Sequence, residues 1–416
     1  RGHGIDTLGD VFDHVDPQIV LASLDIHGTS RGLQVMGYTT VEIRDTSIHD
    51  NISTNAGAAI YQDNSRTLIH DSSIVGNQVT GAGQYGVVRH LINWDLSYFG
   101  FTELWNSTVA DNVGGGIYGA GTRAHGCLFE GNSEIRAASN TLASFFEDSD
   151  FIGNLAGAVS GANVTVERCR FIDNQDDAGA AVVTGYKATV RDSLFVGNHA
   201  EQGGAITGWI GDFNSADIDV FDSVFIANTA TQGGAIYSHG YWFMGSADID
   251  VVNCQFIANQ AEAGGALFGS LDAYASSFTG NTAASGDVLA GFIDAFGEDL
   301  YPFAGRLHSC AMWPDEVGTT VVHQVDNSCF PAGMQGFADG GGNVGLITDP
   351  FEILDLDDDG FDTLYLDPAS PCVDLGGMVD GFDASVLTTQ ASQCTDAGLL
   401  DAGAHVTPLE DVGACG

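Results

Sequence analysis

A short motif dominates this chain: an apolar residue followed three positions later by asparagine, which occurs ten times. The copies are Ile48/Asn51, Ile74/Asn77, Val109/Asn112, Phe129/Asn132, Phe151/Asn154, Phe171/Asn174, Phe195/Asn198, Phe225/Asn228, Phe256/Asn259 and Phe278/Asn281. Successive asparagines are 20 to 35 residues apart. Self-similarity in this range indicates a solenoid rather than a globular domain.

The two best copies of the repeat show its full length. Residues 215–228 and 246–259 are nearly the same in sequence, and each copy runs on into a Gly-Gly-Ala turn, at 233–235 and at 264–266. A unit this short cannot bury its own apolar face, so the units must stack on one another.

Each unit is predicted to consist of very short strands joined by tight corners. Alternation places Cys254 and Phe256 on one face of a strand. Asn259 then falls at the strand end, where asparagine tolerates left-handed backbone geometry and caps a turn with its amide. The following Gly-Gly supplies the positive φ angles of a second corner. An alternating-helix solenoid is disfavoured because the units lack a 3.6-residue period.

Parallel stacking at strand spacing would place phenylalanine on phenylalanine and asparagine on asparagine. The sequence therefore predicts an all-β parallel β-helix of about 13 coils. We expect an N-terminal segment or first coils over residues 1–45, regular repeats over 46–300, and terminal coils with an irregular closing cap over 301–416.

The charge of the chain restricts its partners. It has 55 acidic and 12 basic residues, a formal net charge of -43, and Lys187 is its single lysine. Such a surface repels nucleic acid and anionic membranes, attracts cations and keeps a long β-structure soluble. No apolar run reaches the length of a transmembrane segment. The chain shows no signal peptide, and we expect an exported protein in processed form.

The eight cysteines fall into two groups. Cys127, Cys169 and Cys254 occupy positions where other copies have serine, and we expect them to be buried and unpaired, because free cysteine packs as a small core residue. The others lie outside the regular repeats, and in an exported protein some of them should pair, since no CxxC zinc spacing is present. They are Cys310, Cys329, Cys372, Cys394 and Cys415.

An acidic segment near the C-terminus has the pattern of a calcium loop. Asp355, Asp357, Asp359 and Asp362 converge around Gly360 in a D-x-D-x-D-G arrangement. Alternate carboxylates suit a hard cation, and the glycine allows the sharp bend. Leu366 stands where an EF-hand would have its glutamate. Ca²⁺ is the predicted ligand, and a solvated acidic turn is the alternative.

Three insertions into the repeat are rich in aromatic residues and are the predicted binding loops. Residues 89–105 carry Trp94, Tyr98 and Trp105, residues 208–214 carry Trp209 and Phe213, and residues 238–245 carry Tyr241 and Trp242. Flat rings beside amides and acids suit stacking on sugar faces or anchoring of a protein partner. The alternative is that the rings only cover the coil beneath them.

The Phe-x-x-Asn and Gly-Gly-Ala-Ile repeats are similar to those of the chlamydial polymorphic outer-membrane proteins and of the wider bacterial family of secreted parallel β-helix proteins. The C-terminal part resembles the terminal coils and closing segment of the second family at residues 342–344, 349–351, 364–366, 370–376 and 401–404. The resemblance implies a right-handed β-helix and an exported or surface location. It does not imply one activity, because this fold hosts adhesins, structural proteins and polysaccharide-cleaving enzymes.

The sequence therefore favours a non-catalytic structural or adhesive protein of a cell surface that binds glycan or other subunits. Self-association into a filament is a variant, because a solenoid end is an unpaired strand edge. The alternative is a secreted polysaccharide lyase or glycoside hydrolase. Gly2-His3-Gly4 and Asp176-Asp177 resemble fragments of a polygalacturonase active site, but they occur here in the opposite order.

Overall fold

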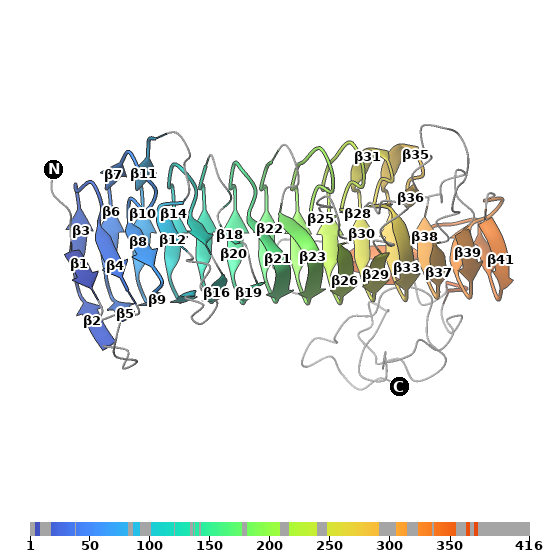
Figure 1. The fold of residues 1–416 in the computed structure, drawn as a ribbon. Helices are drawn as coiled ribbons and strands as arrows, with labels where there is room; N and C mark the ends of the chain where they lie inside the picture. The colour runs from blue at the N-terminus through green and yellow to red at the C-terminus, as the bar shows by residue number, and fades with distance from the viewer. Residues whose placement is uncertain are drawn as a thin grey trace. The chain divides into compact units, whose positions relative to one another are not determined.

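A computed structural model shows the architecture of the chain. It describes residues 5–8, 18–37, 39–81, 86–91, 101–119, 121–133, 136, 138–140, 143–176, 181–208, 216–238, 248–290, 305–313, 323–334, 337–354, 363–366 and 370–372. All regular elements in these residues are β-strands. The fold is a right-handed parallel β-helix, as predicted, and each coil contributes up to three strands to parallel sheets (Figure 1).

The chain divides into two compact units, residues 1–188 with 196–200, and residues 189–195 with 201–416. In the first unit the first strand of each coil is β1 (Ile5–Leu8), β4 (Leu33–Met36), β8 (Ile60–Asp63), β12 (Val88–Leu91), β15 (Ile117–Gly119) or β18 (Ala138–Asn140). The second strand is β2 (Gln18–Ala22), β5 (Thr40–Arg44), β9 (Arg66–His70), β13 (Thr102–Trp105), β16 (Thr122–His125) or β19 (Ala143–Glu147), and β21 (Val159–Glu167) serves as both. Parallel pairing begins before residue 46, because β2 pairs with β5.

The third strands of the first unit form a separate parallel sheet. They are β3 (Asp25–His27), β6 (Ser47–His49), β10 (Ser73–Val75), β14 (Thr108–Ala110), β17 (Leu128–Glu130), β20 (Asp150–Ile152) and β22 (Arg170–Ile172). The short strands β7 (Ile52–Ser53) and β11 (Gln78–Val79) pair with each other. Strands β23 (Val182–Arg191) and β24 (Leu194–Val196) contain the residues at which the two units divide.

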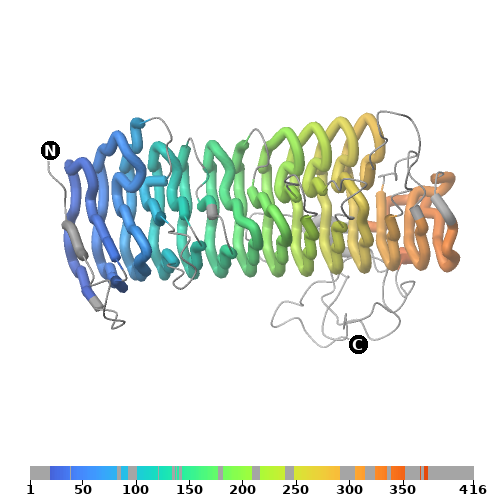
Figure 2. The backbone as a smooth tube through the Cα atoms, viewed as in Figure 1, coloured from blue at the N-terminus to red at the C-terminus, as the bar shows by residue number. Residues whose placement is uncertain are grey.

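The second unit repeats the same coil. Its strands are β25 (Ile206–Gly208), β26 (Asp217–Phe221), β27 (Val224–Ile226), β28 (Ile236–Ser238), β29 (Asp248–Val252), β30 (Gln255–Ile257), β31 (Gln260–Ala263), β32 (Leu267–Phe268), β33 (Ser270–Tyr274), β34 (Ser277–Thr279), β35 (Thr282–Ser285), β36 (Leu289–Ala290), β37 (Arg306–His308), β38 (Ala311–Trp313), β39 (His323–Asp326), β40 (Cys329–Pro331), β41 (Phe337–Gly341) and β42 (Val344–Leu346). The tube in Figure 2 follows the succession of coils within each unit.

The motif phenylalanines form the predicted internal stacks. In the first unit the ring centroids of Phe129 and Phe151 are 4.6 Å apart, and those of Phe151 and Phe171 are 4.7 Å apart. In the second unit Phe225 is fully buried, and its ring centroid is 4.8 Å from that of Phe195 and 4.9 Å from that of Phe256. In-register pairing at strand spacing places each ring on the one before it, and this column is part of the core of each unit.

The motif asparagines form a buried hydrogen-bond ladder. Nδ2 of Asn132 donates to Oδ1 of Asn154 at 3.0 Å, and Nδ2 of Asn154 donates to Oδ1 of Asn174 at 2.8 Å. The same pattern joins Asn228 to Asn259 in the second unit, at 3.0 Å. The expected capping by the amide is therefore present, and it acts between coils as well as within one.

The expected left-handed backbone belongs to a different residue. Positive φ occurs at the position directly before each motif asparagine: Asp50, Gly76, Asp111, Gly131, Gly153, Asp173, Gly197, Ala227, Ala258 and Gly280. The asparagine itself follows the corner and turns its amide inward, where the ladder satisfies it. The sequence prediction was wrong by one residue, because it assigned both the left-handed backbone and the capping amide to the asparagine.

The Gly-Gly turns are as predicted at their first glycine. Gly203, Gly233 and Gly264 have φ values of 57°, 62° and 65°. The second glycine of each pair is required by a close approach: a Cβ on Gly234 would lie 2.1 Å from the carbonyl oxygen of Gly265 in the next coil. Two glycines in succession therefore meet two separate steric needs.

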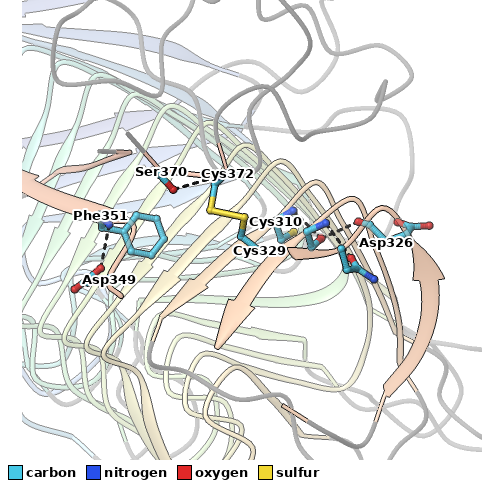
Figure 3. Close-up of a disulfide and its surroundings, with 9 residues drawn as sticks. Cys310, Asp326, Cys329, Asp349, Phe351, Ser370 and Cys372 are labelled. Atoms are coloured by element: carbon cyan, nitrogen blue, oxygen red, sulfur yellow. Dashed lines mark hydrogen bonds between the residues drawn. A yellow bond between two sulfur atoms is a disulfide. The ribbon is translucent and has the colours of Figure 1, made fainter. Parts of the chain in front are cut away.

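An antiparallel hairpin, here called the closing hairpin, follows the last coil of the second unit, and Figure 3 shows the disulfide next to it. Strands β43 (Phe351–Leu354) and β44 (Thr363–Leu366) pair antiparallel, in contrast to the parallel coils. A disulfide joins Cys329 of β40 to Cys372 beyond the hairpin. Leu346, Leu366 and both cysteines pack in one buried cluster with Ala311. The disulfide thus fastens the closing segment to the last coils.

The remaining described cysteines are buried and form no disulfide, namely Cys127, Cys169, Cys254 and Cys310. This confirms the expectation for the three cysteines at serine positions. For the second group, Cys329 and Cys372 pair as expected, Cys310 stays reduced, and Cys394 and Cys415 lie outside the described residues.

Candidate binding surfaces

Six of the seven predicted aromatic binding residues lie outside the described residues. Trp94 and Tyr98 fall in 92–100, Trp209 and Phe213 in 209–215, and Tyr241 and Trp242 in 239–247. The structure describes the strands that flank the last two segments. Gly208 of β25 pairs with Ser238 of β28, and Ile218 of β26 pairs with Ile249 of β29. The described strands on both sides of these two segments therefore pair in register between neighbouring coils.

Trp105, the seventh residue, lies on a strand rather than in a loop. The predicted insertion over 89–105 was too long, because its ends form β12 and β13 in the parallel sheet. Trp105 is paired with His70 of the preceding coil, and the two rings stack with centroids 4.5 Å apart and an interplanar angle of 6°. The indole is half-buried, so one part of this aromatic pair remains accessible on the outer face.

The predicted calcium ligands Asp355, Asp357, Asp359 and Asp362 also lie outside the described residues. Their segment, 355–362, connects β43 to β44. Leu354 and Thr363, at its two ends, are partners in the antiparallel pair. The ends of the acidic loop are therefore held together by the closing hairpin.

An acidic row crosses the outer face of the second unit. Asp219, Asp250 and Asp272 occupy equivalent positions on β26, β29 and β33. Desolvation by burial, followed by repulsion from Asp272 and Asp219, raises the pKa of Asp250 to about 6. Burial disfavours the charged carboxylate, and the like charges at paired positions add to this effect. Sequence reasoning missed the row, although the repeated Asp-Ile-Asp-Val was its visible signal.

The acidic row ends at a charged cluster. Arg306 of β37 is paired with Asp272, and its guanidinium contacts Asp326 at 2.8 Å. His308 Nδ1 lies 2.5 Å from the other oxygen of Asp326. Burial would raise the pKa of Asp326, but the hydrogen bonds from Arg306 and His308 outweigh it and lower that pKa. Asp326 therefore stays ionised and holds the two basic groups together.

A second cluster, in the first unit, has ligand atoms close enough to hold a metal ion. One ligand atom from each of His125, Glu147 and Asp148 lies within 4.8 Å of the others. The guanidinium of Arg168 already bonds to both carboxylates, with Nε 2.7 Å from Asp148. Hydrogen bonding to Arg168 lowers the pKa of Asp148. The charge of Arg168 thus offsets that of Glu147 and Asp148.

The buried thiols are unsuited to nucleophilic chemistry. Burial raises the pKa of Cys127 to about 11 and that of Cys169 and Cys310 to about 12. A thiolate is the reactive form, so these groups act as packing residues. Of the fragments that resemble polygalacturonase, Asp176 forms an ion pair with Arg136, while Gly2–Gly4 and Asp177 lie outside the described residues.

Comparison with known proteins identifies the repeat. Residues 222–239 match the family model of the Chlamydia polymorphic membrane protein repeat. This segment contains Phe225, Asn228 and the Gly-Gly-Ala-Ile turn. No curated protein and no solved structure matches the chain. The expected resemblance is confirmed: the chain is a β-helix with repeats like those of the polymorphic membrane proteins.

The repeat and the fold together fit a surface protein. Among the described residues there is no helix with the length and hydropathy needed to cross a membrane.

Proposed function

We propose that this chain is a non-catalytic, extracellular or cell-surface β-helix protein that binds glycan or another protein subunit. The observation that carries the proposal is the register of the strands around the two aromatic segments. Segments 209–215 and 239–247 begin after paired residues and end before paired strands of adjacent coils. Coils lie about 4.8 Å apart in the hydrogen-bonding direction, so the strand ends to which the two segments connect lie side by side.

The composition of these segments favours sugar or protein surfaces as ligands. Trp209, Phe213, Tyr241 and Trp242 provide large, rigid rings at low cost in conformational entropy. Asp212 and Asn214 of segment 209–215 can orient a hydroxyl-rich partner by hydrogen bonds. Trp105, stacked on His70, is a further aromatic platform of the first unit.

The test is the double variant Trp209→Ala/Trp242→Ala. We expect it to keep the far-UV circular dichroism of the wild type and to lose binding to glycans or to partner subunits. Tyr186→Ala is the matched control, because Tyr186 is 50% exposed on a strand and lies outside the three aromatic insertions. Unchanged binding in the double variant, or an equal loss of binding in the control, would reject the proposed surface.

Two further parts of the proposal concern assembly and calcium. Self-association into a fibre through strand edges is the assembly variant, and light scattering of the purified protein at increasing concentration tests it. Ca²⁺ binding at 355–362 would stabilise the closing hairpin, because the antiparallel pairing of β43 and β44 already holds the ends of that loop together.

One observation favours an enzyme instead, a polysaccharide lyase or glycoside hydrolase. Asp250 has a pKa of about 6 and lies in a row with two other carboxylates. A carboxyl group that is partly protonated near neutral pH can act as a general acid. Cleavage of a polysaccharide by the pure protein, abolished by Asp250→Asn, would establish this alternative over the adhesive function.

A further inference from the structure

The outer face of the first unit carries a row of arginine and tyrosine side chains. Gln34 of β4 pairs with Tyr61 of β8, Tyr61 pairs with Arg89 of β12, and Arg89 pairs with Tyr118 of β15. Each of these residues is half-buried and alternates with fully buried neighbours on its strand. The four residues therefore form one continuous outward-facing line across four coils.

Arginine and tyrosine alternate by direct contact in this line. The guanidinium of Arg31 lies over the ring of Tyr61, 4.3 Å from its centroid, and that of Arg89 lies over the ring of Tyr118 at the same distance. Nη1 of Arg31 also donates to Oε1 of Gln34 at 2.7 Å. These contacts hold both guanidinium planes in fixed orientations, which lowers the entropy lost when they bind a ligand.

Positive charge in this place is unusual for the chain. The chain has 12 basic and 55 acidic residues. Most of the described arginines accordingly form ion pairs with carboxylates. Arg44, Arg66, Arg136, Arg168, Arg170 and Arg306 are of this kind. In the part of the chain that the structure describes, Arg31 has a glutamine and a tyrosine as partners and no carboxylate.

The row continues as hydroxyl groups. Tyr118 pairs with Ser139, Ser139 pairs with Ser160, and the two serine hydroxyls are 3.0 Å apart. Six strands at about 4.8 Å spacing give a line of about 24 Å. Its exposed groups are guanidinium N–H, phenol, amide and hydroxyl, all of which form hydrogen bonds.

We propose that this row, Arg31, Gln34, Tyr61, Arg89, Tyr118, Ser139 and Ser160, binds a linear glycan that carries spaced carboxylate groups. The proposal rests on the adhesive function above and assigns it a second, separate surface and a ligand class. Planar guanidinium groups match carboxylates in a bidentate manner, and the hydroxyl and amide groups suit sugar hydroxyls.

The chemistry of the row separates this ligand from other candidates. A peptide or protein partner is anchored by apolar side chains in pockets, and this line presents only polar groups and tyrosine edges. A densely charged polyanion would be repelled by the rest of a chain with a net charge of -43. Asp63, two residues along β8, would add to this repulsion, although burial raises its pKa. A glycan whose few carboxylates contact only Arg31 and Arg89 avoids most of this electrostatic repulsion.

Isothermal titration with three matched oligosaccharides tests the assignment. The probes are an oligogalacturonate of defined length, the same oligosaccharide after reduction of its carboxyl groups to alcohols, and a fully sulfated derivative of the reduced form. For the wild-type protein we expect the oligogalacturonate to bind at least about tenfold more tightly than either derivative, the loss corresponding to one or two charge-assisted contacts.

The variant Arg31→Gln/Arg89→Gln should lower affinity for the oligogalacturonate at least about tenfold and leave the weak binding of the reduced form unchanged. Arg191→Gln is the matched control, because the Arg191 guanidinium also lies over an aromatic ring, 4.0 Å from the centroid of Phe221, but outside this row. It should bind as the wild type does. If the glutamine variant fails to fold, Arg31→Lys/Arg89→Lys keeps the charge, and loss of the planar fork should still weaken binding severalfold.

The outcomes separate this inference from the proposed function. Equal binding of the oligogalacturonate and its reduced form, or full affinity in the folded arginine variants, would overturn the inference. If the same protein still lost glycan binding on substitution of Trp209 and Trp242, the adhesive function would stand without this surface. Absence of binding to any glycan or protein partner would overturn both.

Discussion

The asparagine ladder makes a quantitative prediction for a single rung. Asn154 is fully buried, and its side chain takes part in four hydrogen bonds. Its Nδ2 donates to the carbonyl of Phe129 at 3.0 Å and to Asn174 at 2.8 Å. Its Oδ1 accepts from the backbone N–H of Asn132 at 3.1 Å and from Nδ2 of Asn132 at 3.0 Å. Asn154→Ala removes all four.

At about 1 kcal/mol net for each bond, the variant should lose about 4 kcal/mol of stability. The loss should be concentrated at Asn132, whose buried backbone N–H then has no acceptor at that place. Urea unfolding followed by circular dichroism measures the total, and hydrogen exchange of the Asn132 amide measures the local effect.

Glu130→Ala is the control for this experiment, because Glu130 is exposed at the end of β17 beside the ladder. Its substitution should change stability by no more than about 0.5 kcal/mol. A loss below about 1 kcal/mol for Asn154→Ala, with unaltered exchange at Asn132, would refute the view that the ladder joins the coils.

Four other substitutions or conditions test further parts of the molecule. Phe225→Ala should cost about 3–5 kcal/mol, since the ring is fully buried between two others; a loss below about 1 kcal/mol in urea unfolding would contradict this. Cys372→Ala opens a loop of 43 residues and should destabilise the closing segment by about 4 kcal/mol, seen as earlier proteolysis there; identical digestion with and without reductant would argue against it. Millimolar Ca²⁺ should raise the melting temperature more than Mg²⁺ does, and Asp357→Ala should remove the difference; equal shifts with both ions would identify a solvated turn. Asp250→Asn should raise the melting temperature above pH 6 and have no effect below pH 4, because a pKa raised from 3.8 to about 6 means that the wild type loses stability as pH rises through that range; a constant difference at all pH values would disprove the titration.

The fold was predictable because its signals are local and repeated. The phenylalanine and asparagine positions keep the same spacing in every coil, since both belong to one strand and the corner after it. Asn154 and Phe225 therefore occupy the predicted columns. The left-handed residue was misplaced because Asp, Gly and Ala all occur before the asparagine, so composition alone does not reveal the corner.

The arginine–tyrosine row could not be read from the sequence for a geometric reason. Tyr61 follows its motif asparagine, Asn51, by 10 positions (61 minus 51), whereas Tyr118 follows Asn112 by only 6 (118 minus 112). The turns between asparagine and the next strand differ in length, and only the observed register places these residues in one line. Trp105 was predicted to lie in an inserted loop but belongs to a strand, because the aromatic segment around it shows no regular alternation.

We propose above that the chain binds its ligand without cleaving it. The most direct measurement is to titrate the pure protein with oligogalacturonate of defined length and then determine the mass of the recovered oligosaccharide. The account predicts a saturable heat of binding and an unchanged mass. Shortened or unsaturated products, formed by the wild type and lost in Asp250→Asn, would contradict it and identify an enzyme.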